Sequence, residues 1–220
     1  MDDVLRMNQN KNNSTKRFIL LVASLAILAA FSGALFFKLL QSRGQESLQA
    51  LIVLPAAKVV ADFELYDEEG GKFTLADFKG DWSVLFFGFT SCPDICPNTL
   101  YQLQQVREQL AEELPGTKLP RFYLVSVDPD RDSPEKLAEY LAYFDPEFKG
   151  VSGAEPQLRA LTMQLGIAYH VAEHSKTAED YAVDHSASLV LLNPQAELYG
   201  VFPAPHQVES IRNDLLQVIN

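Results

Sequence analysis

The chain has 220 residues, 47% of them hydrophobic, which is enough for one domain of about 150 residues and an additional segment. Its 29 acidic and 18 basic residues give a net charge of −11; because residues 1–43 hold two of the acidic and six of the basic ones, the remainder has 27 acidic against 12 basic residues, or −15. This acidity excludes nucleic acid and anionic lipid headgroups as partners of the remainder and favours metal ions or cationic proteins, although solubility alone explains it equally well.

An uncharged apolar run of twenty residues occupies positions 18–37 and reads FILLVASLAILAAFSGALFF. As a helix it is long enough to cross about 30 Å of hydrocarbon. Lys11, Lys16 and Arg17 lie just before it, and the preference of basic residues for the cytoplasm places the N-terminus inside and the rest of the chain outside. The predicted segments are a cytoplasmic stretch, a transmembrane anchor, a linker and an exported domain: residues 1–17, 18–40, 41–57 and 58–220.

A cleavable signal peptide is the alternative to this anchor. Ser32 and Ala34 could serve as the small residues of a cleavage site. However, the apolar run continues to Phe37, which is longer than a signal peptide needs, and no cysteine follows that could be lipidated. Asp2 and Asp3 argue against a mitochondrial transit peptide, which is poor in acidic residues. We therefore expect a single-pass protein of a bacterial inner membrane, with its C-terminal domain in the periplasm.

The first half of the exported domain predicts a hairpin, a buried strand and a helix. Residues 59–65 and 72–75 alternate loosely on either side of a turn containing Gly70 and Gly71, as two short paired strands do. Residues 82–89 are almost continuously apolar, which is typical of a central strand covered on both faces. Apolar residues at helical spacing follow Pro97 and predict a helix that ends at Pro115.

The second half continues the alternation of strands and helices. Residues 121–127 predict a second buried strand, and a helix reaching Phe144 follows a turn in which Asp132 and Glu135 form a plausible capping box. The remaining predicted elements are a strand, a helix, a strand, the two strands of a hairpin and a last amphipathic helix: residues 150–153, 156–165, 167–172, 187–192, 197–202 and 208–219. This order predicts an α/β fold, a thioredoxin-like mixed sheet flanked by helices.

Cys92 and Cys96 are the only cysteines, and they lie at the junction between the buried strand and the first helix. A lone, closely spaced pair favours redox or metal chemistry over a structural disulfide, because closing so short a loop stabilises a fold little. In the first helical turn Cys96 is expected to have a lowered pKa. The spacing allows a redox-active disulfide or a shared metal, while the three residues between the cysteines, one more than redox enzymes of this fold usually have, leave room for an ion. Asp94 between them is expected to be a turn or cap residue whose charge opposes metal-free thiolates.

Four histidines are candidates for a third ligand. His185 precedes a buried strand, in a loop that lies beside the cysteines in this fold, so it is the favoured one. His170 and His174 lie in a strand pattern, where a spacing of four residues does not bring side chains together. His206, at the start of the last helix, is expected to be an ordinary exposed polar residue.

Three stretches, FFGFTSCPDICPNTL, DPDRDSP and VDHSASLVLLNP, resemble the Sco (SenC) family of copper chaperones, and the resemblance covers about residues 61–219. It implies a thioredoxin-like fold with copper bound by Cys92, Cys96 and His185. It also implies that the protein assists assembly of the binuclear copper centre of cytochrome c oxidase subunit II, with that subunit and a periplasmic copper donor as partners. Members of the family commonly have histidine where this chain has Ser91, which leaves the three ligand positions intact.

The chemistry of these residues agrees with the resemblance. Two thiolates and one imidazole suit copper in its two oxidation states, whereas structural zinc normally has four ligands. The main alternative is a thiol–disulfide oxidoreductase that reduces the target's cysteines before copper enters; the absence of proline from residues 184–188 weakens a general reductase. A peroxidase and a purely structural domain are less favoured. Asp128, Asp130 and Asp132 lack the glycine and distal glutamate of a calcium loop, so we expect them to form a solvated turn.

Overall fold

The computed structural model describes residues 24–25, 27–34, 47–172 and 181–219. It divides into two units, Met1–Ser47 and Leu48–Asn220, which are described separately. In the first unit, residues 24–25 and 27–34 are helical. Among the described residues, no helix combines the length and the apolar character that crossing a membrane requires. The predicted cytoplasmic segment and most of the predicted anchor 18–40 lie outside the described residues.

The described part of the second unit is built on a mixed sheet of eight strands in the order β1-β10-β9-β4-β5-β6-β2-β3. The central strand β4 pairs in parallel with β5 and antiparallel with β9. A separate antiparallel ribbon joins β7 and β8. The strands are β1 Ile52–Lys58, β2 Glu64–Asp67, β3 Lys72–Thr74, β4 Ser83–Gly88, β5 Arg121–Ser126, β6 Lys149–Ser152, β7 Tyr169–Val171, β8 Val183–His185, β9 Leu189–Leu192 and β10 Leu198–Phe202.

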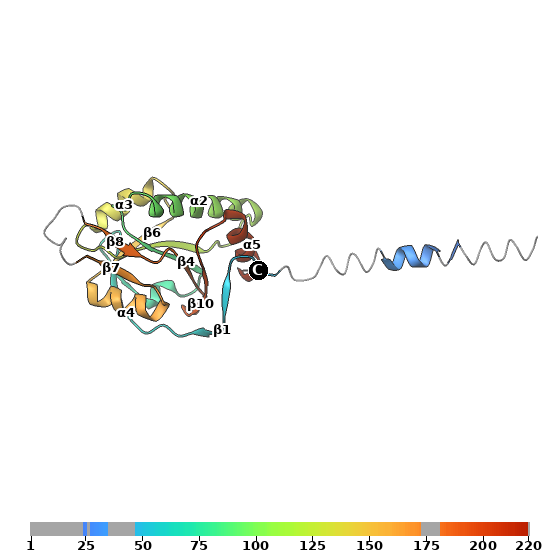
Figure 1. The fold of residues 1–220 in the computed structure, drawn as a ribbon, viewed down its shortest axis with the longest axis horizontal. Coiled ribbons are helices and arrows are strands. Elements are labelled where there is room, and N and C mark those ends of the chain that lie inside the picture. The colour runs from blue at the N-terminus through green and yellow to red at the C-terminus, as the bar shows by residue number, and fades with distance from the viewer. Residues whose placement is uncertain (1–23, 26, 35–46, 173–180, 220) are drawn as a thin grey trace, which may run out of the picture. The chain divides into compact units, whose positions relative to one another are not determined.

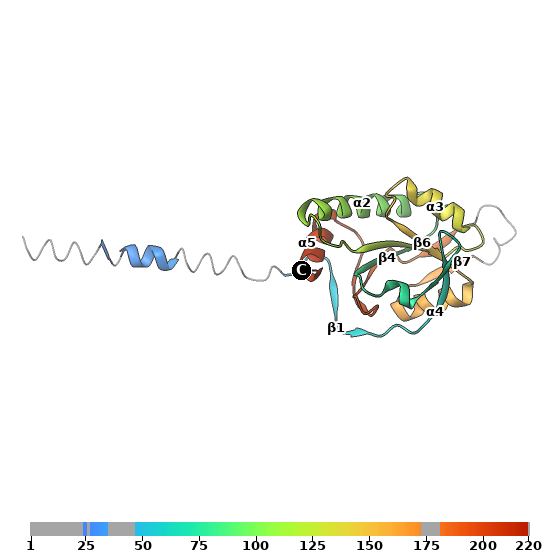
Figure 2. The ribbon, with the colours of Figure 1, turned by 180° about the vertical axis from the view of Figure 1, so that it is seen from behind.

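Helices cover both faces of this sheet. Figures 1 and 2 show α2 and α3 on one side of the strands and α4 on the other, and α5 packs against α2. The helices are α2 Ile95–Glu113, α3 Pro134–Ala142, α4 Glu155–Leu165 and α5 Val208–Ile219, with a short 3-10 helix at Leu75–Phe78. The predicted α/β class, a mixed sheet flanked by helices, is therefore confirmed.

The buried character of β4 follows from this two-sided cover. All six of its residues are buried, because successive side chains point to opposite faces and each face meets a helical layer. Phe86 and Phe87, for example, are fully buried on opposite faces of the strand. Burial of such side chains contributes about 1.5–3 kcal/mol each, so β4 is a rigid base for the turn that follows it.

Strand β1 lies at the sheet edge, paired with β10, and six of its seven residues fall in the range 41–57 that the sequence predicted as a linker. Most of its residues are exposed, so its sequence lacks the alternation that marks a half-buried strand. It also contains Pro55, which has no N–H to donate and is tolerated in a strand mainly at an edge. The folded unit therefore begins before residue 58, the boundary predicted from the sequence.

Asp214 of α5 fixes the chain just before β1. Its side chain is fully buried, and its carboxylate accepts hydrogen bonds from the backbone N–H groups of Gln49, Ala50 and Leu51 at 2.8, 2.7 and 2.7 Å. Three consecutive backbone donors on one carboxylate make a strong, charge-assisted contact. The start of this unit is thus attached to the last helix of the chain.

Candidate metal centre

The cysteine pair lies in the turn that joins the end of β4 to the start of α2. The Cys92 N–H donates to the Phe89 carbonyl at 3.3 Å and closes a tight turn. Cys96 is the second residue of α2, and its N–H donates to Cys92 Sγ at 3.4 Å, so Cys92 Sγ lies over the first helical turn. Asp94 occupies the N-cap position, as predicted, but its side chain accepts from Asn98 Nδ2 at 2.7 Å and bonds no backbone N–H of the helix.

His185 reaches the same turn from the segment before β9, the antiparallel neighbour of β4. It ends β8, and the chain then continues into β9, whose antiparallel pairing with β4 places Leu189 opposite Phe86. His185 Nε2 lies 3.4 Å from Cys96 Sγ, while Nδ1 lies 3.2 Å from the Ser186 carbonyl. With its proton on Nδ1, the imidazole would donate to that carbonyl and present the Nε2 lone pair to the cysteines.

The structure brings the three predicted ligands together. One donor atom from each of Cys92, Cys96 and His185 lies within 4.8 Å of the others, and this is the only such group of His, Cys, Asp or Glu side chains among the described residues. Both cysteines are free thiols. The His185 ring packs edgewise against Phe86 and Phe89, each with a centroid distance of 5.9 Å, which fixes its plane.

Burial decides the protonation of the site. Cys96 is fully buried, and burial together with its contact to Cys92 raises its pKa well above that of an ordinary thiol. The expectation of a lowered pKa at the start of a helix is therefore wrong for Cys96, because loss of water outweighs the helix dipole. Burial also lowers the pKa of His185, which keeps its imidazole neutral and able to bind a metal. A metal ion must displace the Cys96 proton when it binds.

Gly88 packs directly against Cys96 Sγ, a role that was not predicted from the sequence. A Cβ atom at this position would lie 2.8 Å from Cys96 Sγ and 3.0 Å from the Phe86 ring, closer than such atoms pack. A glycine within a strand pattern often marks such a close approach, and that was the available signal. The position of Cys96 Sγ therefore depends on the absence of a side chain at Gly88.

We expect Gly88→Ala to displace Cys96 Sγ and weaken metal binding while the fold survives, because overpacking of this kind costs about 1–3 kcal/mol. Metal affinity and thermal unfolding of the variant measure the two effects. Gly150→Ala is the matched control: its Cβ would lie 3.0 Å from Leu137 and 3.1 Å from Leu141, and neither is a predicted ligand. Equal losses of metal affinity in both variants would contradict a specific role for Gly88.

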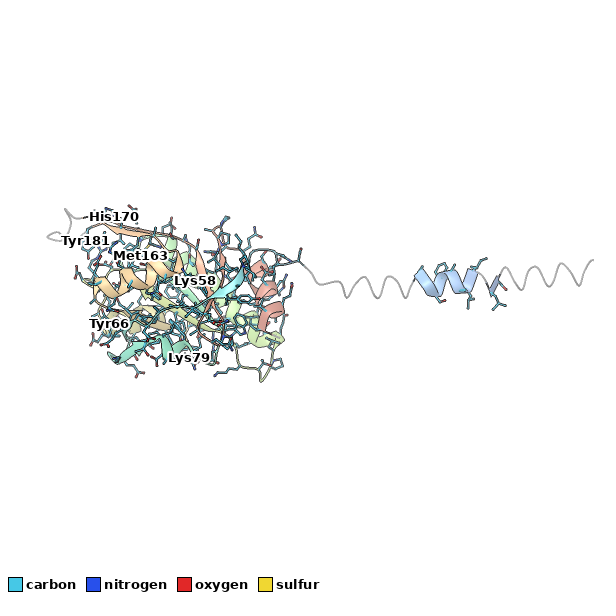
Figure 3. All side chains as sticks on the ribbon, turned by 90° about the horizontal axis from the view of Figure 1, so that it is seen from below. Lys58, Tyr66, Lys79, Met163, His170 and Tyr181 are labelled. Carbon is cyan, nitrogen blue, oxygen red and sulfur yellow. The ribbon has the colours of Figure 1, made fainter. Side chains whose placement is uncertain are left out.

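The other histidines lie elsewhere. His170 is exposed on β7, at the end of the domain where Tyr181 also lies (Figure 3), and it lines a cleft of about 860 Å³ with Tyr66 and Arg159. His206 was predicted to be exposed, but it is half-buried, because its Nε2 bonds the Ala187 carbonyl at 2.7 Å. It therefore supports the segment that follows His185. His174 lies outside the described residues.

The three aspartates after β5 do not form a solvated turn, so that prediction is wrong. Asp128 is buried and bonds Arg131 Nε at 2.5 Å, and it also accepts a hydrogen bond from the Tyr181 hydroxyl. Asp130 is exposed. Asp132 is fully buried, and the predicted capping box is absent because Ser133 is the N-cap of α3. Asp128 and Asp132 bond different partners, and the three aspartates form no candidate metal group among the described residues.

The sequence pattern of the SCO1/SenC family matches residues 53–220. The chain belongs to the SCO1/SenC family. Among its relatives, the mitochondrial SCO2 homolog of Homo sapiens is 35% identical over 179 residues, which cover 80% of this chain and 66% of the human protein. This chain thus spans just under two thirds of the length of that relative.

Solved structures of the SCO1/SenC family have the same fold. The ScoI protein of Arabidopsis thaliana with copper bound is 28% identical, with a TM-score of 0.66 over 73% of this chain and 98% of that one. Yeast Sco1 with copper bound is 26% identical, with a TM-score of 0.68 over 74% of this chain and 88% of that one. Together with the observed sheet, these similarities confirm the thioredoxin-like arrangement expected from the sequence.

The donor set of this SCO1/SenC protein fits a soft metal ion. Two sulfurs and one neutral imidazole nitrogen converge from Cys92, Cys96 and His185. Soft thiolates prefer Cu(I) and other thiophilic ions, whereas hard ions such as Mg²⁺ and Ca²⁺ prefer oxygen. Cys92 is half-buried while Cys96 is fully buried, so one side of the group is more open than the other. An ion held here would be reached from the side of Cys92.

Proposed function

We propose that this protein is a copper chaperone that binds one copper ion through Cys92, Cys96 and His185. The observation that carries the proposal is the convergence of two thiols and an imidazole from segments 89 residues apart. The copper-bound relatives from Arabidopsis and yeast, with the same fold at 28% and 26% identity, support copper as the ion. The recipient that we propose is the binuclear copper centre of cytochrome c oxidase subunit II, with a separate copper donor upstream.

The geometry suits an ion that is carried and passed on. The Cys92 and Cys96 thiols each release a proton as they bind copper, and the neutral His185 supplies nitrogen, which Cu(II) prefers. Three protein ligands leave at least one coordination position open, as in sites where a further ligand must enter. A thiolate of the recipient protein could therefore attack the ion from the side of the half-buried Cys92 before the chaperone's ligands leave.

We also propose that the domain works in the periplasm, anchored in a bacterial inner membrane by residues 18–40. The uncharged apolar run 18–37 and the basic residues before it support this placement. An anchored chaperone would stay in the same plane as a membrane-bound oxidase, which raises the rate of encounter by confining both partners.

His185→Ala is expected to remove the Cu(II) site while leaving the fold intact, because it deletes the nitrogen ligand and spares both sulfurs. The full-length protein, purified in detergent and loaded with one equivalent of Cu(II), should lose its wild-type thiolate-to-copper absorption and its electron paramagnetic resonance spectrum. His170→Ala is the control, since His170 is exposed on β7 and outside the ligand group. An unchanged Cu(II) spectrum in the His185 variant would remove His185 from the site.

The second candidate function is reduction of a target disulfide, which the closeness of the free thiols Cys92 and Cys96 also supports. In that reaction the two thiols would form a disulfide, and their two electrons and two protons would convert the target's disulfide to two thiols. The same variant separates the functions, because exchange needs the cysteines and not His185. Rapid reduction of an oxidised subunit II by the metal-free protein, without copper transfer from the loaded protein, would favour the reductase.

A further inference from the structure

Asp132 is a fully buried carboxylate whose hydrogen bonds converge on the turn before the cysteines. It accepts from the Thr90 N–H at 2.9 Å, from the Thr90 hydroxyl at 2.5 Å and from the Ser126 hydroxyl at 2.6 Å. Ser126 is the last residue of β5, so its contact attaches the carboxylate to the central sheet. Asp132 thereby joins the cysteine turn to the strand beside β4.

Thr90 is the point at which this contact acts on the metal centre. It is the second residue of the tight turn that the Cys92 N–H closes on the Phe89 carbonyl. A second contact follows at Ser91, whose hydroxyl lies 3.3 Å from Lys136 Nζ, and Lys136 Nζ lies 3.6 Å from the Asp132 carboxylate. Both residues before Cys92 are therefore held by the segment that begins α3.

The other two ligands do not share this support. Cys96 is placed by the first turn of α2 and by its packing on Gly88, and His185 by Phe86, Phe89 and the Ser186 carbonyl. Cys92 is half-buried and lies in the turn itself, so its position depends on how that turn is held. Loss of the hydrogen bonds between Asp132 and Thr90 should therefore move Cys92, while Cys96 and His185 stay in place.

We propose that Asp132 is a positioning residue of the metal centre: through Thr90 it holds the turn so that Cys92 Sγ faces Cys96 and His185. The required property is the set of three hydrogen bonds to Thr90 and Ser126. Asparagine could reproduce it, with its carbonyl oxygen accepting from the Thr90 N–H and Ser126 and its amide donating to the Thr90 hydroxyl. Alanine leaves a buried backbone N–H and two hydroxyls without this acceptor.

The test compares Asp132→Ala, Asp132→Asn and Thr90→Val in the full-length protein. Cu(II) affinity is expected to fall by about 10- to 100-fold in Asp132→Ala, as it does when a partner that orients a ligand is lost, with a changed thiolate-to-copper absorption. Thr90→Val keeps the N–H contact and loses the hydroxyl contact, so a smaller loss is expected. Asp132→Asn should restore both the affinity and the spectrum.

Asp214→Ala separates positioning from general loss of stability. Asp214 is also fully buried and accepts three hydrogen bonds, but its partners are Gln49, Ala50 and Leu51, and no ligand is among them. We expect this variant to unfold at a lower temperature and to bind copper with a wild-type spectrum. A wild-type spectrum and affinity in Asp132→Ala, with stability reduced as in the Asp214 variant, would overturn the proposal.

This inference rests on the proposed copper binding for its first readout, so a second readout without metal accompanies it. Oxidised glutathione accepts two electrons and two protons from Cys92 and Cys96, giving the intramolecular disulfide and two molecules of reduced glutathione. The equilibrium constant of this exchange depends on the placement of Cys92 and should change in Asp132→Ala and return in Asp132→Asn. Absence of copper binding in the wild type would refute the function alone; an unchanged exchange equilibrium in Asp132→Ala would refute the positioning role.

Discussion

Replacement of Cys96 by serine is expected to abolish tight Cu(I) binding. The loss of affinity should exceed the roughly 10- to 100-fold loss expected when a residue that only orients a ligand is removed. The substitution removes one of two sulfurs, and sulfur is the donor that Cu(I) prefers. It also places a hydroxyl where Cys96 is fully buried, between Gly88 and His185. Competition with a colorimetric Cu(I) chelator gives the affinity, and urea unfolding gives the stability.

Cys92→Ser is the matched comparison for this experiment. Cys92 is half-buried, so its hydroxyl replacement can reach water and should leave stability nearly unchanged. Both variants should lose copper, and only Cys96→Ser should also lose stability, by about 1–3 kcal/mol. Tight Cu(I) binding by either variant would mean that the two sulfurs do not share one ion.

Asp214→Ala is expected to destabilise the domain by about 2–4 kcal/mol, the largest loss of stability that we predict for a residue outside the metal centre. The substitution leaves three backbone N–H groups without their acceptor, and the Leu51 N–H is buried, where an unmade hydrogen bond costs about 1–3 kcal/mol. Urea unfolding measures the change. Hydrogen exchange should also become faster at Gln49, Ala50 and Leu51 and in β1.

The control for Asp214 is Gln217→Ala on the same helix. Gln217 is exposed, so its replacement should change the free energy of unfolding by no more than about 0.5 kcal/mol. If both variants unfold at the wild-type urea concentration, the carboxylate does not hold the start of the domain.

Much of the site could be predicted because its chemistry is concentrated in a few rare residues. Cys92 and Cys96 are the only cysteines, and the apolar run before them identifies β4, the strand that delivers them. His185 was found from its place before the next buried strand, and the antiparallel pairing of β9 with β4 puts it where the sequence predicts. Buried central strands carry this information because both of their faces demand apolar residues.

The features that were not predicted correctly from the sequence have weak or misleading sequence patterns. Strand β8 has three residues, one of them an exposed aspartate, and within the described part of the chain its only partner strand is β7. Asp132 and Glu135 fit the spacing of a capping box, yet Ser133 takes the cap and Asp132 turns inward. Sequence spacing gives the position of a residue along the chain, but the depth of its side chain depends on tertiary packing.

The depth at which Cys96 is buried also explains why the predicted lowering of its pKa is wrong. Its place in the first helical turn was predicted from the pattern, and the helix dipole there does favour a thiolate. The sequence does not reveal that the sulfur is fully buried against Gly88, and this burial raises the pKa of Cys96 instead. Asp214 was missed for a similar reason: its partners are backbone N–H groups 163 to 165 residues away in the chain.

The division of the site between two distant segments has a mechanical consequence. Cys96 and His185 are 89 residues apart, and their meeting depends on the register between β4 and β9. A slip of β9 by two residues would move His185 by about 7 Å, beyond the reach of a shared ion. Copper bound by all three ligands would therefore act as a reversible cross-link that favours the correct register and stabilises the fold. Passing the ion on, as we propose that this protein does, would also release this constraint on its own chain.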